Sequence, residues 1–310
     1  MDSQSMRRRG SRSRPACRPT VQPLETRQVL SSFTAVPLGF NIATTLPLTD
    51  GRLLAQDGGS PTFHLLSPTA GGSYASPSDA VAAPSIDPRF YYGSAVLKDG
   101  RVLFSGAEYG TGKNKIEIYD PNLNSWTAVA DPSFFPGQIG DNDIKVMTDG
   151  TVLAGDGGGD GVYGLYNPTT KAWTQVAGLP TGWQNESSLA MLPDGSIFTL
   201  STGGNGGPDQ GFRYVPSLNR WVSAGMAPVR INTGEGGPIV QLPDGKLFFT
   251  ADNINSPGGA THQPINTAIY TRRRPRPGPD RGRSARRSRW RRTRSPATSP
   301  WPRCPMGMSS

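Results

Sequence analysis

Five Asp-Gly pairs recur along this 310-residue chain at intervals of 49, 50, 45 and 50 residues. The pairs begin at Asp50, Asp99, Asp149, Asp194 and Asp244. Such regular spacing indicates that one structural unit of roughly 50 residues is repeated, and a repeated unit determines the architecture of the fold.

Each Asp-Gly pair separates two short apolar runs and therefore predicts a β-hairpin. We expect a two-residue type I′ turn, in which both central residues have positive φ. The second run ends in glycines, and an aromatic-x-Pro turn followed by a Trp comes next. This third segment runs from Tyr119 to Trp126, from Tyr166 to Trp173 and from Tyr214 to Trp221, with a weaker copy from Leu66 to Tyr74. Each unit therefore predicts four strands and no helix.

A four-stranded antiparallel sheet repeated in this way is the blade of a β-propeller, so we expect an all-β fold with about five blades. The chain resembles the Kelch and galactose-oxidase-type propellers, whose units carry an Asp-Gly turn, a Gly-Gly loop, Tyr-x-Pro and then Trp. The resemblance covers residues 33–270. A β-sandwich of stacked hairpins is the alternative, but it does not explain why the Asp-Gly-to-Trp separations stay at 27, 24 and 27 residues.

Charge divides the chain into three parts. Residues 1–30 carry +5 and residues 271–310 carry +12, so the net charge of +9 leaves −8 for residues 31–270. We expect a basic leader over residues 1–32, a mildly acidic propeller over 33–270 and an Arg/Pro-rich disordered tail over 271–310. Because the basic charge belongs to the two ends, the sequence argues against nucleic acid as a partner unless the tail is genuine.

The tail begins where the repeat is interrupted, since an arginine run follows Tyr270 in place of the expected Asp-Pro and Trp. One interpretation is a basic arm that binds phosphates. The other is a frameshift product, because GC-rich DNA read out of frame encodes a composition rich in Arg, Pro, Gly, Ser and Ala. The frameshift is favoured, since the repeat is interrupted at a strand-to-turn junction and not at a domain boundary. A natural tail implies a ring of five blades, and a frameshift implies truncation from six or seven.

The interruption leaves the fifth unit with three expected strands and no outer strand. The segment Phe33–Val36 resembles the outer-strand sequence that starts at Trp126, so it is a candidate to close the ring onto the last blade. An unclosed ring would expose strand edges and favour aggregation.

The N-terminal leader predicts the cellular location of the protein. Residues 23–31 resemble a Leu-Glu-x-Arg-x-Leu-Leu-Ser segment found near the start of exported bacterial proteins, which predicts an extracellular or cell-envelope location. Cys17 and Cys304 lie outside the repeats, so no disulfide framework is expected. No stretch approaches ~20 apolar residues, so we expect no transmembrane helix.

The variable polar residues are expected on the face opposite the Asp-Gly turns, which we call the loop face. Asp141 and Glu186 each precede an Asp-Gly pair by eight residues and Glu235 by nine, so these carboxylates are candidates to surround the channel mouth. They would bind a cation or the hydroxyl groups of a sugar. The alternative is that they are solvated loop acids.

Aromatic residues of the same face are the second set of candidates. Tyr91, Tyr92 and Trp183 lie in blade-to-blade linkers, where they would act as stacking platforms for a ligand. The alternative is that they pack between blades. Glu108 and Tyr109 lie in the loop after the second strand of the second unit and share this face.

The number and position of Cys and His residues decide whether this chain could carry out oxidase chemistry. The resemblance to galactose oxidase implies a cross-linked Tyr-Cys cofactor and two histidine ligands for copper. This chain has only His64 and His262, and no Cys lies between residues 18 and 303. The Tyr-Cys cofactor cannot form, so we expect neither a cofactor nor a metal.

The sequence therefore favours a non-catalytic Kelch-type propeller that binds a protein or carbohydrate partner through its loop face. The alternative is a carbohydrate-active enzyme, oxidase-like or hydrolase-like, that is truncated at its C-terminus. The fold does not distinguish them, because propellers support both roles.

Overall fold

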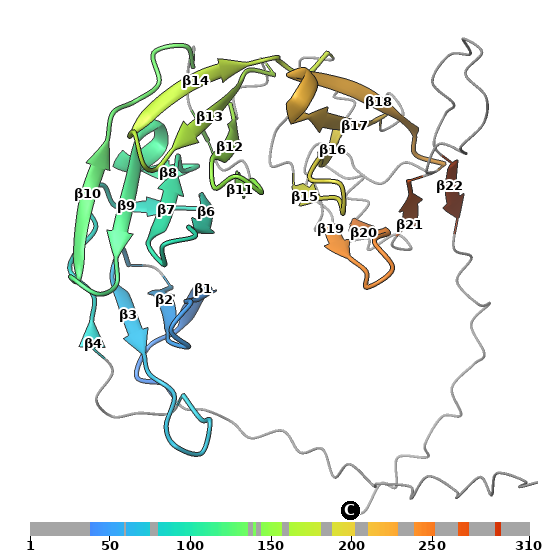
Figure 1. The fold of residues 1–310 in the computed structure, drawn as a ribbon. Coiled ribbons are helices and arrows are strands. Elements are labelled where there is room, and N and C mark those ends of the chain that lie inside the picture. The colour runs from blue at the N-terminus through green and yellow to red at the C-terminus, as the bar shows by residue number, and fades with distance from the viewer. Residues whose placement is uncertain are drawn as a thin grey trace, which may run out of the picture. The chain divides into compact units, whose positions relative to one another are not determined.

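The computed structural model describes residues 38–58, 60–74, 80–135, 139–140, 144–156, 161–180, 188–201, 210–228, 239–251, 266–272 and 289–292. The chain divides into two units, Met1–Val36 and Pro37–Ser310, and every described residue belongs to the second. Strands and tight turns dominate these ranges (Figure 1), with two short 3-10 helices, η1 (Thr111–Asn114) and η2 (Pro216–Leu218). Neither helix has the length or apolar character needed to cross a membrane.

Five four-stranded antiparallel sheets form the blades, and their strands are paired in chain order. Blade 1 consists of β1 (Ile42–Pro47), β2 (Leu53–Asp57), β3 (Phe63–Leu66) and β4 (Ala80–Val81). Blade 2 consists of β6 (Gly93–Val96), β7 (Val102–Ser105), β9 (Ile116–Asp120) and β10 (Ser125–Val129). Blade 3 consists of β11 (Ile144–Val146), β12 (Val152–Gly155), β13 (Tyr163–Asn167) and β14 (Ala172–Val176).

The last two blades repeat the same order, and a small ribbon is added at blade 2. Blade 4 consists of β15 (Leu189–Met191), β16 (Ile197–Ser201), β17 (Gln210–Val215) and β18 (Arg220–Met226). Blade 5 consists of β19 (Ile239–Gln241), β20 (Leu247–Ala251), β21 (Asn266–Thr271) and β22 (Arg289–Arg292). The ribbon pairs β5 (Arg89–Phe90) with β8 (Tyr109–Gly110).

These sheets form a five-blade β-propeller, which confirms the predicted fold class and blade number. The first strands of successive blades are neighbours, because β1 contacts β6, β6 contacts β11, β11 contacts β15 and β15 contacts β19. This sequential arrangement excludes the β-sandwich, in which the strands would divide into two facing sheets.

Blade 1 departs from the predicted pattern at its outer strand. β4 begins at Ala80, whereas the weaker sequence copy placed the corresponding strand near Tyr74. The Tyr74 hydroxyl instead donates a hydrogen bond to the carbonyl oxygen of Gly51 at 2.8 Å. A local turn, closed by the Thr69 N–H bonded to the Ser73 carbonyl oxygen, delays the start of the strand.

The Asp-Gly turns do not have the predicted type I′ geometry. In the first turn the Gly51 N–H donates to the Leu48 carbonyl oxygen, and the Leu48 N–H donates to the Arg52 carbonyl oxygen. The five turn glycines have φ between +77° and +92°, whereas none of the five aspartates has positive φ. Each connection is therefore a three-residue hairpin loop made of a type I turn followed by a left-handed glycine.

Neighbouring turns also pack against each other. A Cβ on Gly245 would lie 2.7 Å from Cγ of Pro193, and a Cβ on Gly100 would lie 2.8 Å from Oγ1 of Thr49. In each case the second residue belongs to the turn of the preceding blade. Glycine is thus required in these turns both for its positive φ and for the close approach of the next turn.

Blade 5 has four strands, so the expectation that it lacks its outer strand is wrong. β22 pairs with β21 and places Trp290 opposite Tyr270. The same Tyr-Trp opposition occurs at Tyr119 and Trp126, Tyr166 and Trp173, and Tyr214 and Trp221. The arginine-rich composition of this segment is compatible with a strand, because strands pair through hydrogen bonds between backbone N–H and C=O groups. Phe33–Val36, the alternative closing segment, lies outside the described residues.

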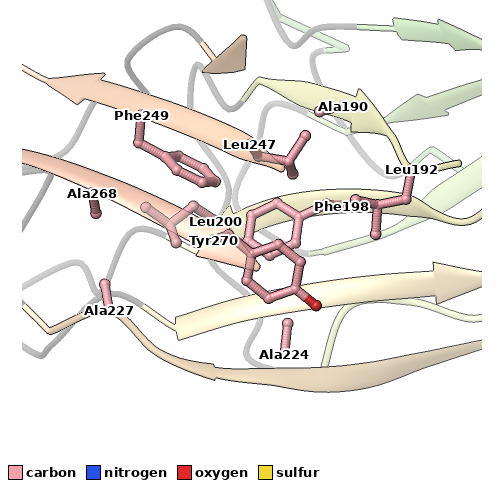
Figure 2. Close-up of a cluster of buried hydrophobic side chains, with 10 residues drawn as sticks. All are labelled: Ala190, Leu192, Phe198, Leu200, Ala224, Ala227, Leu247, Phe249, Ala268 and Tyr270. Carbon is pink, nitrogen blue, oxygen red and sulfur yellow. The ribbon is translucent and has the colours of Figure 1, made fainter. Parts of the chain in front are cut away.

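Apolar side chains fill the junctions between blades. At the junction of blades 4 and 5 (Figure 2), the ring centroid of Phe198 lies 5.3 Å from that of Phe249 and 4.6 Å from that of Tyr270. On β12, Leu153 packs toward blade 4, whereas its neighbours Val152 and Ala154 pack toward blade 2. Both faces of the second strand are therefore buried, which explains its continuous apolar run.

A paired hydrogen bond adds to this packing at the junction of blades 1 and 2. Oδ1 of Asn124 accepts the Ala83 N–H at 2.8 Å, and Nε1 of Trp126 donates to the Ala83 carbonyl oxygen at 2.6 Å. The Tyr119 hydroxyl donates to the same Asn124 oxygen at 2.7 Å. We call this arrangement the Asn-Trp clamp, since it holds both backbone groups of one residue in the preceding blade.

The Asn-Trp clamp recurs between blades 3 and 4 but not between blades 2 and 3. Asn219 and Trp221 hold both backbone groups of Ala177 at 3.0 and 2.8 Å. In blade 3, Lys171 occupies the position of the Asn, and the buried Nε1 of Trp173 has no hydrogen-bond partner in the part of the chain that the structure describes. Lysine has no side-chain acceptor and cannot make the clamp.

Candidate functional site

Most of the predicted loop-face site lies outside the described residues. This applies to Asp141, Trp183, Glu186 and Glu235. The predicted arrangement of carboxylates around the channel mouth therefore stays a prediction. Tyr91 and Tyr92 are described, and both lie in the linker between β5 and β6.

Tyr92 is directed into the junction of blades 1 and 2. Its hydroxyl donates to Oε1 of Gln56 at 2.9 Å, and its ring centroid lies 5.3 Å from that of Phe104 and 6.5 Å from that of Phe63. Burial raises the pKa of Tyr92 above its usual value, an effect that a hydrogen bond with Thr44 opposes. Tyr92 therefore packs between blades, which is the alternative that the sequence left open for these aromatics.

Tyr91 faces solvent beside a second tyrosine. The exposed fractions are 67% for Tyr91 and 53% for Tyr109. Their ring centroids are 5.9 Å apart and their planes meet at 70°, which is the edge-to-face geometry that aromatic pairs prefer. We call Tyr91 and Tyr109 the loop-face tyrosine pair.

The strand directions place this pair on the loop face. β7 runs from the Asp99 turn to Ser105, and Tyr109 follows the far end of that strand. The linker that carries Tyr91 leads into β6, whose first residue Gly93 lies opposite Ser105. Both tyrosines are therefore at the end of blade 2 that is opposite its Asp-Gly turn.

The backbone at Tyr91 is strained. Its φ is +51°, in the left-handed region that costs a non-glycine residue about 1–2 kcal/mol. The Glu108 N–H donates to the carbonyl oxygens of Tyr91 and Phe90, at 2.8 and 3.1 Å, and so fixes this conformation. Strain of this kind at an exposed aromatic residue points to a functional constraint.

A buried ion pair lies beneath the tyrosine-bearing linker. Nη2 of Arg89 is 2.5 Å from Oε2 of Glu117, and the two side chains are only 1% and 0% exposed. The Glu117 carboxylate also accepts the Ser85 hydroxyl at 2.7 Å and the Ile86 N–H at 2.8 Å. The pair is thus fully hydrogen-bonded, which is the condition under which a charge pair is tolerated in a protein interior.

Arg89 completes its hydrogen bonds with backbone oxygens of blade 2. Its guanidinium donates to the carbonyl oxygens of Lys115 at 3.0 Å and Asp87 at 3.2 Å. Burial lowers the pKa of Arg89 below its usual value, and the charge of Glu117 opposes that effect. Gly112 leaves room for the side chain, because a Cβ there would lie 3.0 Å from Cβ of Arg89.

One carboxylate beside the tyrosine pair is available to a ligand. Glu108 is half-buried next to Tyr109, and its side chain makes no hydrogen bond or ion pair within the described ranges. An aromatic pair with an adjacent carboxylate can stack against a planar or apolar group and accept hydrogen bonds from it.

A cavity of about 240 Å³ lies on the opposite face, between the turns of blades 2 and 3. It is lined by residues that include Lys98, Asp99 and Asp149. Asp99 is paired with Arg101 at 2.7 Å, and Asp149 accepts the Thr151 hydroxyl at 2.7 Å. Because the two carboxylates are engaged within their own turns, we assign this cavity to the scaffold.

Potential metal ligands do not form a cluster in the part of the chain that the structure describes. His64 stacks on Phe40 with ring centroids 3.8 Å apart, and His262 lies outside the described residues. Within the described ranges, no group of three or more His, Cys, Asp or Glu side chains is placed to hold a metal ion.

Tyr109 and Glu108 were expected on the loop face from the sequence but were not among the candidate binding residues, and the role of Glu117 was not predicted. Tyr109 could have been recognised from its position. It lies in a loop of blade 2, and Tyr91 lies in the linker that leads into the same blade. Glu117 gives no such signal, because an acid between two isoleucines of β9 shows neither its burial nor its partner.

Comparison with known proteins supports the fold. No protein-family model matches the chain, and no curated protein matches it. A selenomethionine-substituted virginiamycin B lyase from Staphylococcus aureus matches with a TM-score of 0.52 and 13% identity, over 74% of this chain and 67% of that one. A streptogramin B lyase matches with a TM-score of 0.51 and 14% identity, over 74% and 65%.

A third match is weaker. A fungal alcohol oxidase of the AA5 family, in complex with copper, has a TM-score of 0.39 and 14% identity over 67% of this chain and 57% of that one, which is too distant to support an argument. The chain thus spans between 57% and 67% of the length of these structures. Identities this low establish a shared propeller fold and leave function to the site.

Proposed function

We propose that this chain is a non-catalytic, Kelch-type propeller that binds a protein or carbohydrate partner through its loop face. The leader that resembles an export segment supports a location outside the cytoplasm of a bacterium. The five Asp-Gly turns and the repeated Tyr-Trp opposition support the Kelch-type assignment.

The loop-face tyrosine pair is the observation that carries this proposal. Two large aromatic side chains are exposed next to each other, although burying each would be favourable by roughly 1.5–3 kcal/mol. The backbone that presents Tyr91 is strained, and a buried ion pair supports it. Tyrosines held rigidly at a surface lose little conformational entropy on binding and are enriched in recognition sites.

The competing proposal is a carbohydrate-active enzyme that is truncated at its C-terminus. It requires two carboxylates at a catalytic separation, and its candidates Asp141, Glu186 and Glu235 lie outside the described residues. Two of the structural neighbours are lyases by name, so an assay of turnover belongs in the test.

The test begins with the full chain on an array of glycans and an array of peptides. Ligands that are retained would be titrated by calorimetry against two double variants. One is Tyr91→Ala with Tyr109→Ala, which removes the tyrosine pair. The other is Leu123→Ala with Leu218→Ala, a matched control that removes two exposed leucines, 74% and 61% exposed, from the turns between third and fourth strands.

We expect the tyrosine variant to lose binding and the leucine variant to retain it. Equal binding by both variants, or no ligand on either array, would contradict the loop-face proposal. Turnover of retained sugars or of virginiamycin B would instead favour the enzyme.

A further inference from the structure

We infer that the partner is a protein, and that the loop-face tyrosine pair binds an arginine side chain in a basic segment of it. This inference rests on the proposed function and specifies the chemistry of its ligand. Three observations carry it: the geometry of the rings, the free carboxylate beside them and the charge of the propeller.

The ring geometry suits a planar cation. The edge-to-face contact covers at most one face of either ring, and Tyr91 is 67% exposed, so its ring is accessible to a ligand. The face of a tyrosine ring is electron-rich and attracts cations, and a guanidinium can stack on it because it is planar and weakly hydrated.

The carboxylate of Glu108 suits the same group. Its backbone N–H bonds to the carbonyl oxygen of Tyr91, which holds the main chain of Glu108 beside that of Tyr91, and Glu108 directly precedes Tyr109 in the sequence. Among the described residues the Glu108 side chain has no partner, so it can accept the two parallel N–H donors of a guanidinium. Arg89 beneath the linker does not compete for it, because its charge is neutralised by Glu117.

The charge of the propeller favours a basic protein over a sugar. Residues 31–272 and 289–292, which contain all five blades, carry a net charge of −4, which favours association with a cationic partner. Two exposed lysines follow the loop of the tyrosine pair, Lys113 and Lys115, and Lys115 is already ion-paired with Asp131 at 2.6 Å. A neutral sugar could stack on Tyr91 and donate hydrogen bonds to Glu108, but the net charge of the propeller would not attract it.

The experiment titrates the full chain with a capped peptide of sequence Arg-Gly-Arg-Ser-Ala-Arg-Arg-Ser, which is also the sequence of residues 281–288. The control peptide has citrulline in place of each arginine, which keeps the planar shape and removes the charge. Calorimetry at low and at physiological salt would give the dissociation constants. Thermal melts would show that each variant is folded.

We expect the arginine peptide to bind and the citrulline peptide to bind at least about ten-fold more weakly, since several charged contacts are removed. Tyr91→Gly should weaken binding about three- to five-fold, the size of one exposed cation–π contact. Glu108→Gln should weaken binding and also reduce its salt dependence. Leu123→Ala should bind as the wild type does.

The inference is overturned if the arginine peptide does not bind, if citrulline binds equally well, or if Tyr91→Gly and Glu108→Gln bind as the wild type. Its failure can be told apart from failure of the proposed function. If a glycan is retained by the wild type and lost by the tyrosine variant while the arginine peptide does not bind, the loop-face function stands and the arginine chemistry is wrong.

Discussion

At the residue scale, small differences between repeats decide how firmly neighbouring blades are joined. Asn124 and Asn219 have φ of +48° and +40°, and Lys171 at the equivalent position has φ of +58°. Asparagine tolerates this left-handed conformation better than lysine does. The backbone of blade 3 is therefore already suited to the clamp that its side chain cannot make.

We predict that Lys171→Asn stabilises the protein. The new amide oxygen could accept hydrogen bonds from the Tyr166 hydroxyl and from the preceding blade, as Asn124 and Asn219 do. The gain should be about 1–3 kcal/mol, because each of these two hydrogen bonds contributes about 0.5–1.5 kcal/mol net. Urea unfolding would measure it, with Asn219→Lys as the reverse substitution and an expected loss of similar size. A destabilised Lys171→Asn would show that the clamp does not act as we describe.

The strained backbone of Tyr91 can be tested by substitution. Alanine at this position would still be destabilised by the positive φ, whereas glycine would not. Tyr91→Gly should therefore be more stable than Tyr91→Ala by about 1 kcal/mol, although both lose the aromatic ring. Chemical denaturation of the two variants measures the difference, and equal stability would show that Tyr91 is unstrained in solution.

At the element scale, the Asp-Gly turns connect strands and also connect blades. Gly51 and Gly245 both have positive φ, but only Gly245 faces the turn of a preceding blade at close range. The two glycines therefore form a matched pair for separating conformational strain from close packing.

We predict that Gly51→Ala costs about 1–2 kcal/mol, from the left-handed backbone alone. Gly245→Ala should cost more, because its Cβ would lie 2.7 Å from Cγ of Pro193 and the rigid proline ring must shift. Thermal melts of the two variants compare these costs. If the two costs are the same, the neighbouring turns do not pack as closely as the structure indicates.

The same elements show what sequence can and cannot predict. The spacing of Asp-Gly, Tyr-x-Pro and Trp predicts the blades because each signal is local to one hairpin. The turn type was predicted wrongly, because Asp-Gly occurs both in type I′ turns and in type I turns followed by a left-handed glycine. The missed signal was the proline that precedes Asp194 and Asp244, since proline favours the first central position of a type I turn. The partner of Arg89 was not predictable, because Glu117 is brought to it only by the folding of blade 2.

At the scale of the whole molecule, the last blade depends on the basic tail. β22 supplies its outer strand, and Arg272 forms an ion pair with Asp194 of blade 4 at 2.5 Å. Thr271 and residues 289–292, which lie in the Arg/Pro-rich segment, are thus strand residues of blade 5.

We predict that a chain ending at residue 292 melts like the full chain, whereas one ending at residue 272 melts about 2–8 °C lower. The shorter chain loses the backbone hydrogen bonds of β22, each worth about 0.5–1.5 kcal/mol. It also exposes the edge of β21 and should aggregate more readily. Scanning calorimetry and light scattering compare the two chains, and identical behaviour would show that β22 does not contribute to the fold.

The loop face of this propeller, centred on Tyr91, is its proposed binding surface. Hydrogen–deuterium exchange of the full chain should be measured with and without the arginine peptide or a glycan retained on the array. We expect added protection within residues 85–92 and 106–112, and unchanged exchange in the Asp-Gly turns. Protection of the turns, with residues 85–92 unaffected, would show that the ligand binds elsewhere.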